Sequence, residues 1–239
     1  MTPLSPAATD RLRENWTRIR NRIRAALERA GRPADSCRLL AVVKNQPDSR
    51  VAGLLALGQR DLAENRVQAL GARAGSLRRD GTWHLIGHLQ SNKARRARRE
   101  YQCFHGLDSA NLAQRLRTES PSPTPWPVYL QVNVADEPQK FGCQPSQAAE
   151  IAAEVRRSGD LQLVGLMAMA PLGSGPEQAR PWFAKLARLS EDLRRRGELA
   201  PEATGLSMGM SQDFEVAVEE GATLVRVGSA LFDGIESPG

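Results

Sequence analysis

One lysine stands out among the residues that could do chemistry. Lys44 ends the apolar run 38–44, which predicts a buried strand that delivers a single amine at its C-terminal end. Only four of the 33 basic residues are lysines, and the other 29 are arginines. A lysine amine can form an imine with an aldehyde, whereas an arginine guanidinium stays protonated in a protein. Lys44 is therefore a candidate for Schiff-base chemistry, and the alternative is an ordinary lysine that extends from a strand end into solvent.

Two turns near the C-terminus have the composition of a phosphate site. The first is Ser207-Met-Gly-Met-Ser211, and the second is Arg226-Val-Gly-Ser229. We expect Ser211 to cap the helix that follows it, so that the first backbone N–H groups of that helix point toward a ligand. Each turn alone is a weak signal, because Gly and Ser cap helices in proteins of every function. A phosphate site that faces the amine of Lys44 matches pyridoxal phosphate.

Apolar runs of strand length alternate with segments of helical periodicity along the chain. Eight runs are predicted strands: 38–44, 61–65, 82–87, 103–108, 128–134, 161–169, 205–210 and 223–228. The predicted helices between them include 49–57, 66–78, 109–118, 146–157, 177–196 and 212–219. Eight such units in 239 residues predict a closed (β/α)₈ TIM barrel, and we expect residues 1–239 to form one domain. An amphipathic helix over 9–30 is expected to cover the wall where strand eight lacks a long helix.

A TIM barrel places its functional site at the C-terminal ends of its strands. Lys44 ends the first predicted strand, and the two Gly- and Ser-containing turns follow the last two. We therefore expect the amine and the phosphate site to share one rim of the barrel.

The bulk composition narrows the classes of function. The net charge of +6 invites a nucleic-acid interpretation, but the basic run 93–99 lacks interleaved aromatic residues and favours a solvated helix face. No apolar segment approaches the length of a membrane span, and no secretory signal is visible. We therefore expect a cytoplasmic protein and take a monomer as the starting hypothesis. Three cysteines at unpatterned spacing indicate neither a disulfide framework nor a zinc site.

Several other ionisable residues have simple interpretations. His84 and His105 lie within predicted strands, lack the sequence spacing of metal ligands and are interpreted as structural. His88 follows the third strand and is a weaker candidate for contact with a cofactor. Lys140 is most simply a surface lysine, although its amine could receive or pass on an aldehyde. Asp213 suits the start of a helix but would repel a phosphate unless its carboxylate points away.

The motifs, taken in order, closely resemble those of the pyridoxal phosphate homeostasis proteins, the YggS/PROSC type. The segments that carry the resemblance are 40–44, 63–65, 83–93, 165–171, 206–215 and 221–232. The resemblance runs from about residue 10 to residue 234. It implies an alanine-racemase-like barrel that binds pyridoxal 5'-phosphate and acts in vitamin B6 and amino-acid homeostasis.

The resemblance also implies roles for individual residues. It makes Lys44 the Schiff-base lysine, places Asn65 beside it, and makes Arg226 the partner of the pyridine nitrogen. It assigns five further residues to the phosphate region: Ser207, Gly209, Ser211, Gly228 and Ser229. We also expect Met210, within the first of the two turns, to bind the cofactor. It implies no catalytic residue and no metal ligand.

Three classes of function remain open: a non-catalytic carrier of the cofactor, a pyridoxal enzyme such as an amino-acid racemase, and a basic barrel that binds RNA or a protein partner. A permanently charged Arg226 beside the ring would keep the pyridine nitrogen unprotonated and the ring a weak electron sink. We expect no second domain, and neither Tyr101 nor Tyr129 is expected at a strand end. We therefore expect a non-catalytic carrier that supplies pyridoxal-dependent apo-enzymes, with an amino-acid racemase as the alternative.

Overall fold

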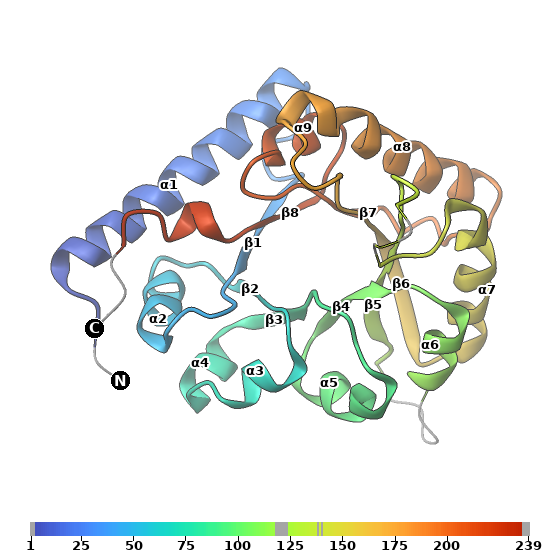
Figure 1. Cartoon of the computed structure of the whole chain (residues 1–239), viewed down its shortest axis with the longest axis horizontal. Helices are drawn as coiled ribbons and strands as arrows, with labels where there is room; N and C mark the ends of the chain where they lie inside the picture. Colours follow the sequence, from blue (N-terminus) through green and yellow to red (C-terminus); the bar gives the residue numbers. More distant parts are fainter. Residues whose placement is uncertain (1–2, 118–123, 138, 140, 236–239) are drawn as a thin grey trace.

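The computed structural model describes residues 3–117, 124–137, 139 and 141–235. Within them, eight parallel strands close into a barrel in chain order, and β1 completes the circle by pairing with β8 (Figure 1). The strands are β1 Arg38–Val42, β2 Asp61–Glu64, β3 Thr82–Leu85, β4 Cys103–Leu107, β5 Trp126–Gln131, β6 Leu161–Met167, β7 Gly205–Ser207 and β8 Leu224–Val227. The predicted (β/α)₈ barrel is confirmed, and each predicted strand is present within a few residues of its expected limits.

Helices surround the barrel and connect its strands (Figure 1). They are α1 Pro6–Arg29, α2 Asp48–Ala56, α3 Val67–Gly71, α4 Gly75–Asp80, α5 Ala94–Glu100, α6 Ala110–Arg115, α7 Ala148–Ser158, α8 Pro176–Arg195 and α9 Phe214–Glu219. The described part of the chain also holds three short 3₁₀ segments: η1 Ser91–Lys93, η2 Pro145–Gln147 and η3 Ser229–Leu231. The helix predicted over 66–78 is two short helices, because the chain between α3 and α4 turns Arg73 inward to bind Glu64 and Asp48.

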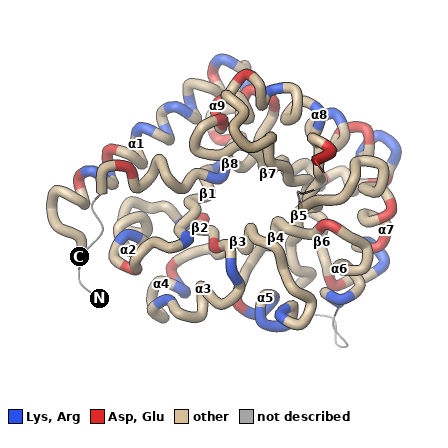
Figure 2. Tube along the Cα trace, viewed as in Figure 1, with Lys and Arg blue, Asp and Glu red and all other residues tan. Residues whose placement is uncertain are grey.

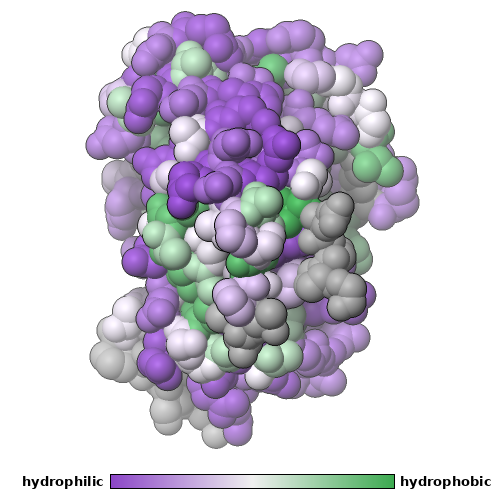
Figure 3. Space-filling view, turned by 90° about the vertical axis from the view of Figure 1, so that its left-hand side faces the viewer, coloured by the Kyte–Doolittle hydropathy of each residue, from purple (hydrophilic) through white to green (hydrophobic). Residues whose placement is uncertain are grey.

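The N-terminal helix α1 covers the wall beside β8, as predicted (Figure 1). Ser5 caps it by accepting a hydrogen bond from the N–H of Ala8, and its apolar stripe is buried along the helix. The Asn15 amide donates to the carbonyls of Leu231 and Asp233, which anchors the helix to the segment after β8. Figure 3 shows the side of the molecule that carries α1, and its upper part is strongly hydrophilic, as expected for an arginine-rich outer face.

Most of the apolar core lies between the strands and the outer helices. Alternate strand residues point the other way, into the barrel, where two small apolar clusters form around Leu40 and Tyr129. Polar side chains share this interior, among them His105, Ser207 and Arg226, all of which are buried. The inside of the barrel is therefore partly polar, and its polar groups need hydrogen-bond partners.

The charged residues lie mainly on the outer helices (Figure 2). The basic run 93–99 forms the end of η1 and most of α5, with Ala97 buried beneath it. Arg96 pairs with Glu100, and Arg98 pairs with Asp160. The helix predicted there is confirmed. Among the described residues, no helix combines the length and the apolar character needed to cross a membrane.

Candidate functional site

Lys44 lies two residues beyond the end of β1, in a turn at the C-terminal rim. The next residue, Asn45, has a left-handed backbone with φ of 61°. The Lys44 side chain is exposed. The strand predicted over 38–44 ends two residues early, at Val42, so the turn carries the amine out of the packed interior.

Arg73 holds the Lys44 turn, a role that the sequence did not predict. Its guanidinium donates to the carbonyls of Val43 and Gln46, each at 2.8 Å, which flank the turn on both sides. Its Nε also donates to the Glu64 carboxylate at 3.0 Å. Burial acts to raise the pKa of Glu64 above its usual value, although the charge and hydrogen bonds of Arg73 oppose the shift. One cation, whose side chain is only 8% exposed, thus ties the lysine turn to the end of β2.

Asn65 follows β2 directly and is exposed at the same rim. A Cβ placed on Gly87 would lie 2.0 Å from the Asn65 carbonyl oxygen and 2.7 Å from its Oδ1. The loops after β2 and β3 therefore approach so closely that only glycine fits at position 87. The structure thus holds Asn65 in a defined place on the rim, close to the lysine turn that Arg73 anchors.

The turn after β7 depends on Gly209. Its φ is 89°, and a Cβ there would lie 2.5 Å from the Cβ of Ala217. The Gly209 carbonyl accepts a hydrogen bond from the N–H of Arg226 at 3.0 Å. Met210 is exposed, and its N–H donates to the Asp213 Oδ1 at 2.6 Å. The Asp213 carboxylate is thus turned back into its own loop, and burial raises its pKa.

Ser211 does not cap the helix that follows it, so that prediction is wrong. Helix α9 begins at Phe214 with Asp213 as its N-cap residue, because the Asp213 carboxylate already closes the turn onto Met210. The Ser211 hydroxyl oxygen instead accepts hydrogen bonds from the N–H groups of Gly228 at 3.3 Å and Ala230 at 3.5 Å. Ser211 therefore joins the loop after β7 to the loop after β8.

The loop after β8 lies beside the lysine turn. Strands β1 and β8 are neighbours in the closed barrel, so Lys44 sits next to this loop rather than across the mouth from it. Gly228 is half-buried, and a Cβ there would lie 3.2 Å from the Val42 carbonyl oxygen. Ser229 is exposed and begins η3.

Three backbone donors are available at the joined loops. Among the hydrogen bonds of the described residues, none engages the N–H groups of Ser211, Gln212 or Ser229. Backbone N–H groups that converge at a rim are suitable donors to phosphate oxygens. Gln212 was not among the residues predicted from the sequence.

Arg226 lies inside the barrel and is only 4% exposed. Its guanidinium donates to the Ser207 carbonyl at 2.6 Å, the Ser207 hydroxyl at 2.8 Å and the Ala168 carbonyl at 2.9 Å. Burial lowers its pKa to about 10, which still leaves the group protonated at neutral pH. Ser207 is fully buried and binds Arg226 and His105, so the structure places its hydroxyl in the interior, apart from the two loops.

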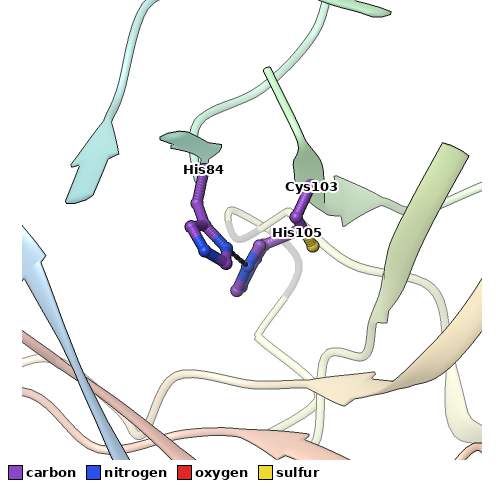
Figure 4. Close-up of side chains that lie close together, drawn as sticks. All are labelled: His84, Cys103 and His105. Carbon is purple, nitrogen blue, oxygen red and sulfur yellow. Dashed lines mark hydrogen bonds between the residues drawn. The ribbon is translucent and has the colours of Figure 1, made fainter. Parts of the chain in front are cut away.

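The histidines occupy two different settings. His84 and His105 point toward one another inside the barrel with Cys103 close by (Figure 4). Their sequence separation gave no sign of this contact, which arises because β3 and β4 are adjacent. His88, by contrast, lies on the rim and stacks on the exposed ring of Phe141. Lys140 falls outside the described residues.

Comparisons with known proteins show which family this chain resembles in sequence and structure. The sequence matches the family described as "Alanine racemase, N-terminal domain" over residues 9–235. It is 40% identical to the pyridoxal phosphate homeostasis protein of Pseudomonas aeruginosa, covering 92% of this chain and 94% of that protein. The protein of the same name from Aquifex aeolicus is 37% identical, with coverages of 92% and 96%. The structure of PipY from Synechococcus elongatus with PLP bound has a TM-score of 0.74 and 37% identity, covering 87% of this chain and 98% of PipY. The chain therefore belongs to the pyridoxal phosphate homeostasis protein family.

Proposed function

We propose that this protein binds pyridoxal 5'-phosphate at the C-terminal rim of the barrel, holds it on Lys44 as a Schiff base, and acts in vitamin B6 and amino-acid homeostasis. The observation that carries the proposal is the joined pair of loops after β7 and β8, with its free backbone donors, directly beside the lysine turn. A relative of 37% identity has been solved with PLP bound, which supports the same ligand here.

Each part of the site, at the rim and below it, has a defined task in this proposal. The N–H groups of Ser211, Gln212 and Ser229 bind the phosphate, and the Ser211 hydroxyl holds the two loops in register. The Arg226 guanidinium faces the pyridine nitrogen, and Asn65 lies near the lysine turn. Pyridoxal phosphate supplies an aldehyde that condenses with an amine, and the exposed Lys44 is the amine beside the phosphate loops.

The protein is proposed to carry the cofactor without catalytic turnover. Pyridoxal catalysis needs a protonated pyridine ring to accept carbanion charge, and a buried guanidinium disfavours that proton. The Arg226 pKa of about 10 keeps its charge at neutral pH. Both tyrosines are buried, Tyr129 against His105 inside the barrel and Tyr101 with its hydroxyl donating to the Arg66 carbonyl. Neither can serve as an acid–base group opposite Lys44.

Release to pyridoxal-dependent apo-enzymes is the proposed use of the bound cofactor. The Lys44 side chain is exposed, so a free amine in solution can reach the bond it forms. An exposed imine exchanges with amines and water more readily than a buried one. Such exposure of the imine would be unfavourable in an enzyme, but it allows a carrier to release the cofactor.

Exchange of the α-hydrogen of alanine with solvent deuterium tests the absence of turnover, because it detects carbanion formation even when no product accumulates. We expect the cofactor-loaded protein to show no exchange at enzyme-like rates of about 1 s⁻¹ or more. Sustained exchange at such rates, lost in Lys44→Ala, would instead assign the protein to the pyridoxal enzymes.

Substitution of Gly228 by valine is expected to weaken binding of pyridoxal phosphate while leaving Lys44 in place. The first carbon of the new side chain would press on the Val42 carbonyl at 3.2 Å and displace the loop that presents Ser229. Loss of one hydrogen bond to a charged group costs about 1.5–3 kcal/mol, or roughly ten- to hundredfold in affinity. Gly175→Ala is the matched control, because a Cβ there meets only the Gln178 side chain at 3.8 Å. Unchanged affinity in a cofactor titration of Gly228→Val would remove these loops from the site.

A further inference from the structure

A continuous line of hydrogen bonds runs through the barrel interior below the rim. The Arg226 guanidinium donates to the Ser207 hydroxyl at 2.8 Å, and that hydroxyl lies 2.9 Å from His105 Nδ1. His105 Nε2 lies 2.9 Å from His84 Nδ1, and His84 Nε2 lies 3.3 Å from the Asp61 carboxylate (Figure 4). Strands β8, β7, β4, β3 and β2 each contribute one member. The line ends in a cation at one end and a carboxylate at the other.

The chemistry of these groups determines which partner donates in each hydrogen bond of the line. A guanidinium only donates, so the Ser207 oxygen accepts and its own hydrogen is left for His105 Nδ1. A neutral His105 then carries its proton on Nε2 and donates it to His84 Nδ1. A neutral His84 likewise carries its proton on Nε2, which donates to Asp61. Every donor therefore meets an acceptor with both imidazoles neutral and in the same tautomer.

The electrostatics of the interior agree with a neutral His105 between two charged ends. Burial, followed by the neighbouring His84, Arg226 and Arg38, lowers the pKa of His105 well below its usual value. Burial acts to raise the pKa of Asp61, but the hydrogen bond from His84 and the charge of Arg38 outweigh it and lower that pKa. His105 thus stays neutral, and Asp61 stays ionised.

Cys103 and Tyr129 also face His105. Together with the two histidines, Cys103 raises the question of a metal site. The three ligand atoms of His84, Cys103 and His105 lie within 4.8 Å of one another. However, two nitrogens bound to one tetrahedral zinc are about 3.3 Å apart, whereas the facing imidazole nitrogens are 2.9 Å apart, a hydrogen-bond distance. Burial raises the pKa of the Cys103 thiol to about 12, so the thiolate that a metal needs is disfavoured. The geometry favours the hydrogen bond.

We propose that Ser207, His105, His84 and Asp61 act as positioning residues for Arg226: their hydrogen-bonded line holds the guanidinium in place and sets the charge that the pyridine nitrogen of the cofactor meets. The inference rests on the proposed function, because it is Arg226 that is proposed to face that nitrogen. The line continues the site to the opposite end of the barrel, where Asp61 begins β2 and pairs with Arg38. Changes at that distant end should therefore alter the bound cofactor.

The tautomers are tested first, in the ligand-free protein. Long-range ¹H–¹⁵N spectra of protein labelled with ¹⁵N-histidine report which ring nitrogen carries the proton. We expect His84 and His105 each to be protonated on Nε2 alone at neutral pH. A proton on Nδ1 of either residue, or a stoichiometric metal ion in the purified protein, would overturn the proposal.

The effect on the cofactor is tested with pyridoxal phosphate labelled with ¹⁵N in its ring. Ser207→Ala removes the link next to Arg226, and Asp61→Asn removes the charge at the far end while its amide oxygen can still accept from His84. We expect both variants to move the ring ¹⁵N resonance, and Ser207→Ala to weaken cofactor binding on the order of tenfold. Asp160→Asn is the matched control: this buried carboxylate just before β6 pairs with Arg98 and lies outside the line.

The tautomer experiment and the ring-resonance experiment together distinguish a failure of this proposal from a failure of the proposed function. A ring resonance identical in wild type, Ser207→Ala and Asp61→Asn, or an equal shift in Asp160→Asn, would show that the line does not act on the cofactor. If the labelled cofactor fails to bind wild type at all, the proposed function is wrong, and the tautomers of the ligand-free protein still report on the line itself.

Discussion

Replacement of Lys44 by alanine is expected to abolish covalent attachment of pyridoxal phosphate while leaving the barrel folded. The Lys44 side chain is exposed, so its truncation removes no buried contact. The turn that carries it is held through backbone carbonyls by Arg73, which the substitution leaves intact. Without an amine next to the phosphate loops, no imine can form there. The visible absorption of the bound cofactor should disappear, and its phosphate should still bind more weakly through the loops.

Lys93→Ala is the matched control for this experiment. Lys93 lies in η1, in the connection that follows β3, and is partly exposed. Its removal should leave the absorption unchanged. Persistence of the absorption in Lys44→Ala, or its loss in Lys93→Ala, would place the covalent attachment elsewhere.

Deletion of residues 1–31 is expected to prevent stable folding. The deletion removes α1, whose large apolar side chains at Leu12, Ile19, Ile23 and Leu27 are buried. Loss of burial at about 1.5–3 kcal/mol for each amounts to roughly 6–12 kcal/mol, which is comparable to the whole stability of a typical domain, about 5–15 kcal/mol. It also removes Asn15, whose amide holds the segment after β8. Thermal unfolding followed by circular dichroism measures the effect.

A single substitution in α1 tests whether the burial of its apolar side chains stabilises the fold. Ile19→Ala should lower the free energy of unfolding by about 2–5 kcal/mol, because Ile19 is fully buried. Glu14→Ala, on the exposed face of α1, should change it by less than about 0.5 kcal/mol. A truncated chain that unfolds cooperatively with nearly wild-type stability would show that α1 is dispensable for closing the wall.

The fold could be predicted from the sequence because its signals are local. Strand-length apolar runs alternate with helical periodicity, and eight repeats in this length leave few architectures other than a closed barrel. The break in the helix predicted over 66–78 was not predictable in this way. It depends on Arg73 reaching Glu64 and Asp48, which are distant in sequence. Tertiary contacts of one side chain overrode the helical pattern.

The site was predicted only in part, because some of its features are local and others depend on contacts between elements. Gly209 and Gly228 stand where the sequence placed them, at turns that leave little or no room for a side chain. The first strand was predicted to end at Lys44 but ends at Val42, because periodicity does not determine where a strand ends to within two residues. The pairing of His84 with His105 was missed because it depends on the register between neighbouring strands. Residues that act through contacts between elements are not visible in a single sequence.

The central claim is that Lys44 holds pyridoxal phosphate at the rim. Borohydride reduction of the loaded wild-type protein, followed by digestion and peptide mapping by mass spectrometry, tests it most directly. Reduction makes the bond permanent, so each lysine can be scored for a pyridoxyl group. The account predicts the adduct on the peptide that contains Lys44. An adduct found only on Lys93, Lys140 or Lys185 would contradict it.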